Sequence, residues 1–264
     1  MRPDPARIRP YRFSLPVAFA AALLLYTGAP APAASKTPPG GEKDAYYWFQ
    51  KGLLGFEGKN YDQAIEDFGK AIRMEPENPT YRYQLAVVYF ALARWEDSER
   101  ELRSALKVNA YYSDAHNLLG AILAEKGDRP GALAEFQKVL SDKSYATPWK
   151  VWVNVALLYE QMGNLEEAVV SYRKALDAQN GYARAHYGLA QVLDRMGRLD
   201  EAIAEYKVAS RDYETSPEFQ YRVGLACFRA GRRDEAREHL NEVVRRAPGT
   251  TDASKAEDLL KLLE

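Results

Sequence analysis

The 34 residues from Ala183 to Ser216, ARAHYGLAQVLDRMGRLDEAIAEYKVASRDYETS, decide the fold of this chain. Small side chains stand at the eighth, twentieth and twenty-seventh positions, as Ala190, Ala202 and Ala209, and Tyr206 stands at the twenty-fourth. Helices approach most closely where their side chains are small, and large side chains then fill the space beside the contact. The stretch also lacks proline, which interrupts helices. It therefore predicts two short helices packed against each other.

The same pattern recurs along most of the chain. The residue equivalent to Ala202 is small in every copy, and the copies are 34, 34, 36, 34 and 34 residues apart: Ala64, Ser98, Ala132, Ala168, Ala202 and Ala236. The residue four positions later is bulky in every copy: Phe68, Leu102, Phe136, Tyr172, Tyr206 and Leu240. A period of this length is the mark of a repeat architecture, in which each helical pair packs on its neighbours.

Turn residues and the last segment support this reading. Four glycines lie between the two helices of a copy, where a residue with positive φ ends a helix: Gly127, Gly163, Gly197 and Gly231. Asp128 follows the first of them and is expected to cap the next helix. The last segment, from Thr251 to Glu264, places a stripe of apolar residues on one face: Ala253, Ala256, Leu259, Leu260 and Leu263. We expect it to form the helix that closes the array.

These residues resemble the tetratricopeptide repeat (TPR), whose pattern is W-x2-L-G-x2-Y followed by A-x3-F, A and P. The resemblance implies an all-α fold, a right-handed α-solenoid of six helix-turn-helix units with a C-terminal capping helix. The expected units are residues 45–78, 79–112, 113–146, 149–182, 183–216 and 217–250, and the capping helix covers residues 251–264.

Residues 1–33 have the layout of a secretory signal peptide. An apolar run from Leu15 to Tyr26 follows four arginines: Arg2, Arg7, Arg9 and Arg12. The run has 12 residues, whereas a membrane-spanning helix needs roughly 20. We therefore expect cleavage after Ala33, in the A-x-A pattern that begins at Ala31, rather than an uncleaved anchor. Residues 34–44 are expected to be a disordered lead-in, and the mature chain is expected in the periplasm, with membrane contact only if the leader is uncleaved.

Composition and isolated motifs argue against catalysis. A net charge of −1 disfavours nucleic-acid binding, and one cysteine, Cys227, cannot form an internal disulfide or a multi-cysteine metal site. His116 and His186 take the fourth positions of their units, where the family has packing side chains. The stretch 52–60, GLLGFEGKN, resembles a phosphate-binding loop but has Asn60 where Ser or Thr belongs. We expect no enzyme activity, no cofactor, no metal and no small-molecule substrate.

The resemblance places candidate binding residues on the first helix of each unit, whose second, fifth, ninth, twelfth and thirteenth residues line the concave surface of TPR arrays. The candidates are Tyr46, Phe49, Leu53, Phe56, Tyr83, Val87, Phe90, Asn154 (one position over), Arg184, Tyr187, Gln191, Arg195, Tyr221 and Arg229. This groove is aromatic at its amino end and polar, with arginines, at its carboxyl end.

Contiguous exposed apolar surface usually marks a binding site, so a partner segment is expected to lie on the aromatic end of the groove. On this hypothesis, Phe49→Ala with Phe56→Ala weakens partner capture and leaves the melting curve nearly unchanged. The alternative is that Phe49, Phe56 and Phe90 pack against neighbouring repeats or the lead-in, in which case the substitutions lower the melting temperature.

The irregular spacing between the third and fourth units suggests a function. Two extra residues there, with Tyr145 and Pro148 in a Tyr-x-Thr-Pro sequence before Asn154, resemble the type IV pilus TPR proteins of the PilF or PilW type. That resemblance implies a periplasmic or outer-membrane protein that helps a secretin ring assemble, although this leader lacks the cysteine that is typically lipidated in that family. The expected partner is a protein or peptide segment, from an outer-membrane secretin or another envelope protein. The alternative is a generic periplasmic TPR scaffold in polysaccharide export or cell-wall assembly.

Overall fold

The computed structural model describes residues 44–264, so the predicted signal peptide and all but the last residue of the predicted lead-in lie outside the described residues. Within this range the chain forms helices and no strands. The helices are α2 (Ala45–Glu57), α3 (Tyr61–Met74), α4 (Pro79–Ala91), α5 (Trp95–Val108), α6 (Ser113–Glu125), α7 (Arg129–Ser141), α8 (Pro148–Met162), α9 (Leu165–Ala178), α10 (Ala183–Arg195), α11 (Leu199–Tyr213), α12 (Pro217–Arg229), α13 (Arg233–Arg246) and α14 (Thr251–Lys261).

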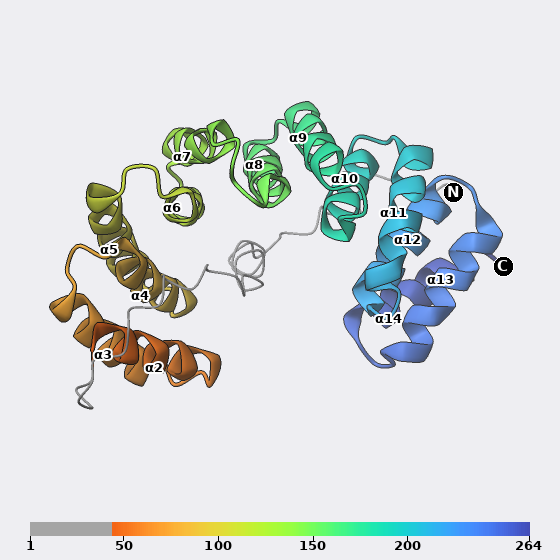
Figure 1. Ribbon diagram of the computed structural model, residues 1–264. Coiled ribbons are helices and arrows are strands. Elements are labelled where there is room, and N and C mark those ends of the chain that lie inside the picture. The colour runs from red at the N-terminus through yellow and green to blue at the C-terminus, as the bar shows by residue number, and fades with distance from the viewer. Residues whose placement is uncertain (1–43) are drawn as a thin grey trace. The chain divides into compact units, whose positions relative to one another are not determined.

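The helices pack in consecutive pairs, from α2 with α3 to α12 with α13, and α14 packs on the last pair. Figure 1 shows the order of the helices along the chain. By their internal contacts they divide into two compact units. Unit 1 ends at Asp142 and contains α2 to α7, and unit 2 runs from Lys143 to Glu264 and contains α8 to α14. These pairs confirm the predicted all-α fold of TPR helices.

The small residues of the repeat lie where the two helices of a pair touch. In unit 2, Ala190, Ala202 and Ala209 are fully buried beside the side chain of Tyr206. In unit 1, a Cβ atom added to Gly120 would lie 2.7 Å from the ring of Phe136. Such a distance is shorter than a van der Waals contact, so the helices are as close as their backbones allow.

A left-handed residue separates the two helices of every pair, always at the fifteenth position counted from the start of the first helix or, for α8, from Trp149. These residues are Lys59 (φ 58°), Ala93 (φ 54°), Gly127 (φ 85°), Gly163 (φ 79°), Gly197 (φ 76°) and Gly231 (φ 75°). The four glycines therefore have the predicted conformation, while Lys59 and Ala93 adopt it against the steric preference of side chains with a Cβ.

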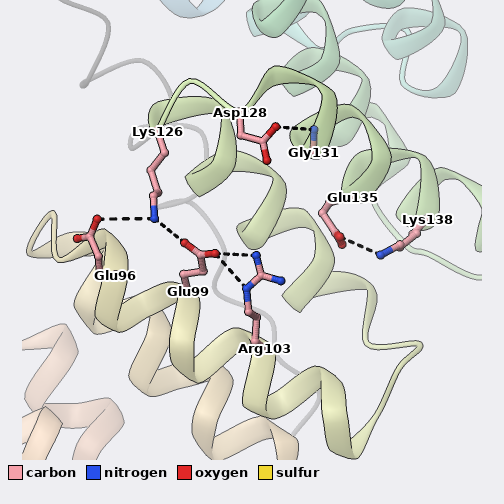
Figure 2. Close-up of polar contacts among 8 residues, drawn as sticks. All are labelled: Glu96, Glu99, Arg103, Lys126, Asp128, Gly131, Glu135 and Lys138. Carbon is pink, nitrogen blue, oxygen red and sulfur yellow. Dashed lines mark hydrogen bonds and ion pairs between the residues drawn. The ribbon is translucent and has the colours of Figure 1, made fainter.

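Polar contacts join neighbouring pairs and cap helices, as Figure 2 shows for unit 1. Lys126, just after α6, reaches back to α5, where its Nζ lies 2.7 Å from Glu99 Oε2 and 3.7 Å from Glu96 Oε1. The backbone N–H of Gly131 donates to Asp128 Oδ1 over 3.0 Å, which confirms the predicted cap of α7. Exposed ion pairs contribute about 1 kcal/mol at most, so the packing of the pairs depends mainly on the buried contacts.

A second polar contact ties the two helices within several pairs, between residues nineteen positions apart. The contacts are Arg82 with Glu101 (3.1 Å), His116 with Glu135 (2.5 Å), His186 with Glu205 (2.6 Å) and, in reversed order, Gln220 with His239 (2.6 Å). His116 also contacts the carbonyl of Ala110 through Nε2 at 3.0 Å. His116 and His186 are therefore structural, as expected, but they act through hydrogen bonds rather than through packing alone.

The last helix closes the hydrophobic core of unit 2. Ala253 and Ala256 of α14, and Leu263 just after it, are buried, and Leu259 and Leu260 pack against the same cluster. Two arginines of α13 donate to the carbonyl of Leu263, Arg233 over 2.8 Å and Arg237 over 3.0 Å. The predicted capping helix is thus present and held at both its face and its end.

Candidate functional site

The candidate surface is made by the first helices of the pairs. Figure 1 shows α4 and α6 on one side of unit 1, and α5 and α7 on the other. In unit 1, α4 contacts both α2 and α6, and in unit 2, α10 contacts α8. We call the side formed by α2, α4 and α6 the unit 1 surface, and the side formed by α8, α10 and α12 the unit 2 surface.

Three aromatic candidates of unit 1 are core residues rather than surface residues. Phe49 is only 1% exposed, and its ring centroid lies 5.0 Å from that of Tyr81 and 5.9 Å from that of Phe68. Tyr83 and Phe90 are also buried. The prediction that Phe49, Tyr83 and Phe90 are open to a partner is therefore corrected, because the next helices of the array cover them.

The remaining apolar candidates of unit 1 are half-buried: Tyr46, Leu53, Phe56 and Val87. The ring of Phe56 lies 5.8 Å from that of Tyr61 at the start of α3, which fixes its position. Tyr46, Leu53 and Phe56 pack against the core around Phe49 and keep part of their side chains at the surface. The apolar part of the unit 1 surface is consequently smaller than expected.

The candidates of unit 2 are mostly accessible, with one exception. Asn154 is 2% exposed and lies inside α8, so it is corrected to an interior residue. The half-buried candidates are Arg184, Tyr187, Gln191 and Tyr221. The ring of Tyr187 packs 4.9 Å from that of Tyr213, and burial raises the pKa of Tyr187 to about 12. Its hydroxyl is therefore a neutral hydrogen-bonding group at physiological pH.

Arg195 and Arg229 are the exposed candidates of the unit 2 surface, and each is held by an acid of the preceding pair. Arg195 donates through a terminal guanidinium nitrogen to Glu160 Oε2 over 2.8 Å, and Arg229 donates to Asp194 Oδ1 over 2.5 Å. The arginine side chains are 48% and 39% exposed, whereas Glu160 and Asp194 are 15% and 17% exposed. We call these two contacts the acid–arginine ladder.

Burial has the largest effect on the pKa values of the two acids of the ladder. It raises the pKa of both Glu160 and Asp194, since the charged form of a carboxyl group is less stable away from water. Tyr172 also donates a hydrogen bond to Glu160 Oε1 over 2.7 Å, so this acid contacts two different helices.

The ladder was not among the predicted contacts, although the sequence contains its signal. In each contact the arginine follows the acid by 35 residues, which is one more than the repeat length. The shift of one position joins the twelfth residue of one first helix to the thirteenth of the next. When the units are aligned, each position is compared only with the same position in the other units. A contact between the twelfth position of one unit and the thirteenth of the next is therefore overlooked.

The structure also places the residues that the sequence raised for metal binding and catalysis. No group of His, Cys, Asp and Glu among residues 44–264 could hold a metal ion. Cys227 is buried, and burial raises the pKa of its thiol to about 11, which makes it a poor nucleophile. The stretch that resembles a phosphate loop lies on α2 and the turn after it. In the same part of the chain, every helix is too short or too polar to cross a bilayer.

Comparisons with known proteins agree with this geometry. The tetratricopeptide repeat family model matches residues 56–122 and 159–221, and a second tetratricopeptide repeat model matches residues 209–250. The heat shock protein STI1 of Saccharomyces cerevisiae is 33% identical over 92 residues, which is 34% of this chain and 16% of that protein. The chain thus spans only a small part of the length of this curated relative.

Two solved structures are similar over nearly their whole length. PilW, described as a widely conserved type IV pilus biogenesis factor, superposes with a TM-score of 0.74 at 20% identity, and the match covers 81% of this chain and 98% of PilW. PilF of Pseudomonas aeruginosa superposes with a TM-score of 0.73 at 20% identity, covering 81% of this chain and 96% of PilF. Together, the repeat pattern, the helical pairs and the family models show that this chain belongs to the tetratricopeptide repeat family.

Proposed function

We propose that this chain is a non-catalytic scaffold of the bacterial cell envelope that assists type IV pilus assembly, by binding a segment of a secretin on its first-helix surfaces. TPR proteins bind protein or peptide partners, and the half-buried apolar and arginine side chains on these surfaces suit a polypeptide. The observation that supports the pilus role most is the similarity to PilW and PilF over 98% and 96% of their chains.

The proposed location is the periplasm, on the export side of the inner membrane. The support comes from residues 1–33, where four arginines, an apolar run and an A-x-A sequence follow one another. An envelope location would bring the first-helix surfaces to the compartment in which secretin rings assemble.

Deletion of the encoding gene tests this function. In a strain with type IV pili, we expect loss of heat-resistant secretin multimers on gels while the amount of secretin monomer is maintained, and restoration by the wild-type chain. Capture of the secretin with the tagged chain from crosslinked envelopes is the direct companion measurement. Unchanged multimers in the deletion strain would contradict the proposal, and a defect in polysaccharide export instead would favour the generic scaffold role.

A further inference from the structure

We propose that the unit 2 surface binds an acidic segment of its protein partner, and that Arg195 and Arg229 are the residues that hold the carboxylates of this segment. This inference rests on the proposed function only in that the surface binds a polypeptide. It does not depend on the partner being a secretin.

The two units differ in charge at equivalent positions of their first helices. At the five positions that line the surface, unit 1 has three acidic residues and no basic one: Glu57, Asp114 and Glu125. Unit 2 has four basic residues at these positions: Lys150, Arg184, Arg195 and Arg229. Its three acidic residues there are Glu160, Asp194 and Glu218. An acidic segment is therefore repelled by the unit 1 surface and attracted by the unit 2 surface.

The exposure of the ladder side chains strengthens this difference in charge between the two surfaces. The acids of the ladder, Glu160 and Asp194, are at most 17% exposed, whereas Arg195 and Arg229 are 48% and 39% exposed. A ligand that approaches the ladder therefore meets its guanidinium groups before its carboxylates. Glu218, the third acid of this surface, is 59% exposed, and its Oε1 lies 3.0 Å from Arg222 Nη2, so its charge is also paired with an arginine. The ladder therefore presents positive charge to a ligand although its acids and arginines are paired.

The ladder also fixes the two arginine side chains before a ligand binds. Arg195 uses one terminal nitrogen for Glu160, and Arg229 uses both of its terminal nitrogens, one for Asp194 Oδ1 and one for the Asp194 carbonyl at 3.4 Å. A guanidinium group has five N–H donors, so each arginine keeps donors that its acid does not use. Arginine binds carboxylates through two parallel hydrogen bonds, which are stronger than neutral ones. Because each side chain is already fixed by its acid, binding loses less side-chain entropy than it would with a mobile arginine.

Tyrosine and amide groups complete the surface between the arginines. Tyr187 and Gln191 lie on α10, and Tyr221 lies on α12 with Nζ of Lys255 5.8 Å from its ring centroid. Neutral hydroxyl and amide groups donate hydrogen bonds to carboxylates and to backbone carbonyls alike. They suit an extended acidic peptide better than they suit an apolar helix.

The test is fluorescence anisotropy with the purified chain and a fluorescein-labelled peptide in which Asp and Glu alternate with Ser. A second peptide replaces the acids by Asn and Gln. The surface variant is Arg195→Gln with Arg229→Gln, and the matched control is Arg173→Gln with Arg211→Gln, which removes the same charge from exposed side chains of the second helices α9 and α11. Circular dichroism melting verifies that both variants are folded.

We expect the acidic peptide to bind the wild-type chain and the control variant alike, and the surface variant about tenfold more weakly, which corresponds to about 1.4 kcal/mol. The affinity should fall as salt is added, because salt screens charges on the surface. Equal binding of the neutral peptide, equal loss in both variants, or no binding of the acidic peptide would each overturn the proposal. Acidic-peptide binding by a chain whose deletion leaves secretin multimers intact would uphold it while contradicting the pilus role.

Discussion

At the scale of single residues, the turn between paired helices gives a sharp comparison between equivalent positions. Ala93 and Gly127 both have left-handed backbones, with φ of 54° and 85°. Because a Cβ disfavours this conformation, Ala93→Gly should raise the free energy of unfolding by about 1 kcal/mol, and Gly127→Ala should lower it by about the same amount. Urea unfolding followed by circular dichroism measures both changes.

A control separates the backbone conformation from the general effect of glycine. Ala134 is exposed in the interior of α7, so Ala134→Gly should destabilise the chain by roughly 0.5–1 kcal/mol. If Ala93→Gly destabilised the chain as Ala134→Gly does, the turn would not have the left-handed conformation in solution.

Because Glu160 is half-buried, we expect the stability of the chain to depend on pH with a defined sign. Burial raises its pKa in the folded chain, so the folded chain binds this proton more tightly than the unfolded chain. The charged carboxylate therefore reduces stability at neutral pH, and the penalty disappears as the pH falls to the ordinary carboxyl range. Glu160→Gln keeps an oxygen for the hydroxyl of Tyr172 and removes the titration. The stability of the wild type relative to this variant should rise as the pH is lowered.

Urea unfolding of the wild type and of Glu160→Gln, at a series of pH values from neutral to the ordinary carboxyl range, measures this difference. The shared titrations of all other groups cancel in the comparison. A difference that stays constant, or that turns against the wild type at lower pH, would show that the Glu160 carboxyl is not destabilised by burial.

At the scale of helices and pairs, the sequence predicts what depends on neighbours close along the chain. The positions of Ala190, Ala202 and Gly163 indicate where the paired helices touch and where the first helix ends, because these requirements act within one repeat. The burial of Phe49 depends on Tyr81, which belongs to the next pair. For the same reason, the predicted mild effect of Phe49→Ala with Phe56→Ala on melting no longer follows from the structure.

The contacts between repeats were the least predictable part of the site. Glu160 with Arg195 and Asp194 with Arg229 join side chains 35 residues apart, on different helical pairs. The repeat pattern fixes which residues lie on the first helix, but the offset between neighbouring pairs depends on how their side chains fit. The arginines were therefore identified as surface residues, while the acids that hold them were not assigned this role.

We expect removal of the capping helix to lower the stability of the chain substantially. Removal of residues 251–264 exposes the core that Ala253, Ala256 and Leu263 cover. The free energy of unfolding of the truncated chain should fall by about 2 kcal/mol or more, which is the usual cost of losing a large buried apolar side chain. It should also bind the dye ANS, which fluoresces on exposed apolar surface. Unchanged stability and no dye binding would mean that α14 does not close the core.

At the scale of the whole molecule, the two units carry different chemistry on the same kind of surface. Unit 1 has half-buried apolar residues with acidic neighbours, and unit 2 has arginines held by half-buried acids. Unit 2 also has its own hydrophobic cluster, from Val153 to Leu263. Taken separately, the unit 1 surface suits an apolar segment and the unit 2 surface suits an acidic one.

Site-specific photocrosslinking in living cells tests the central claim, that the first-helix surfaces bind the partner. A photoreactive amino acid replaces Leu53 or Tyr221 on these surfaces, and in a control it replaces Val170, which is 52% exposed on the second helix α9. We predict a crosslinked product that contains the secretin from Leu53 and Tyr221, and none from Val170. Secretin crosslinks from Val170 alone, or none from any of the three positions, would contradict the account.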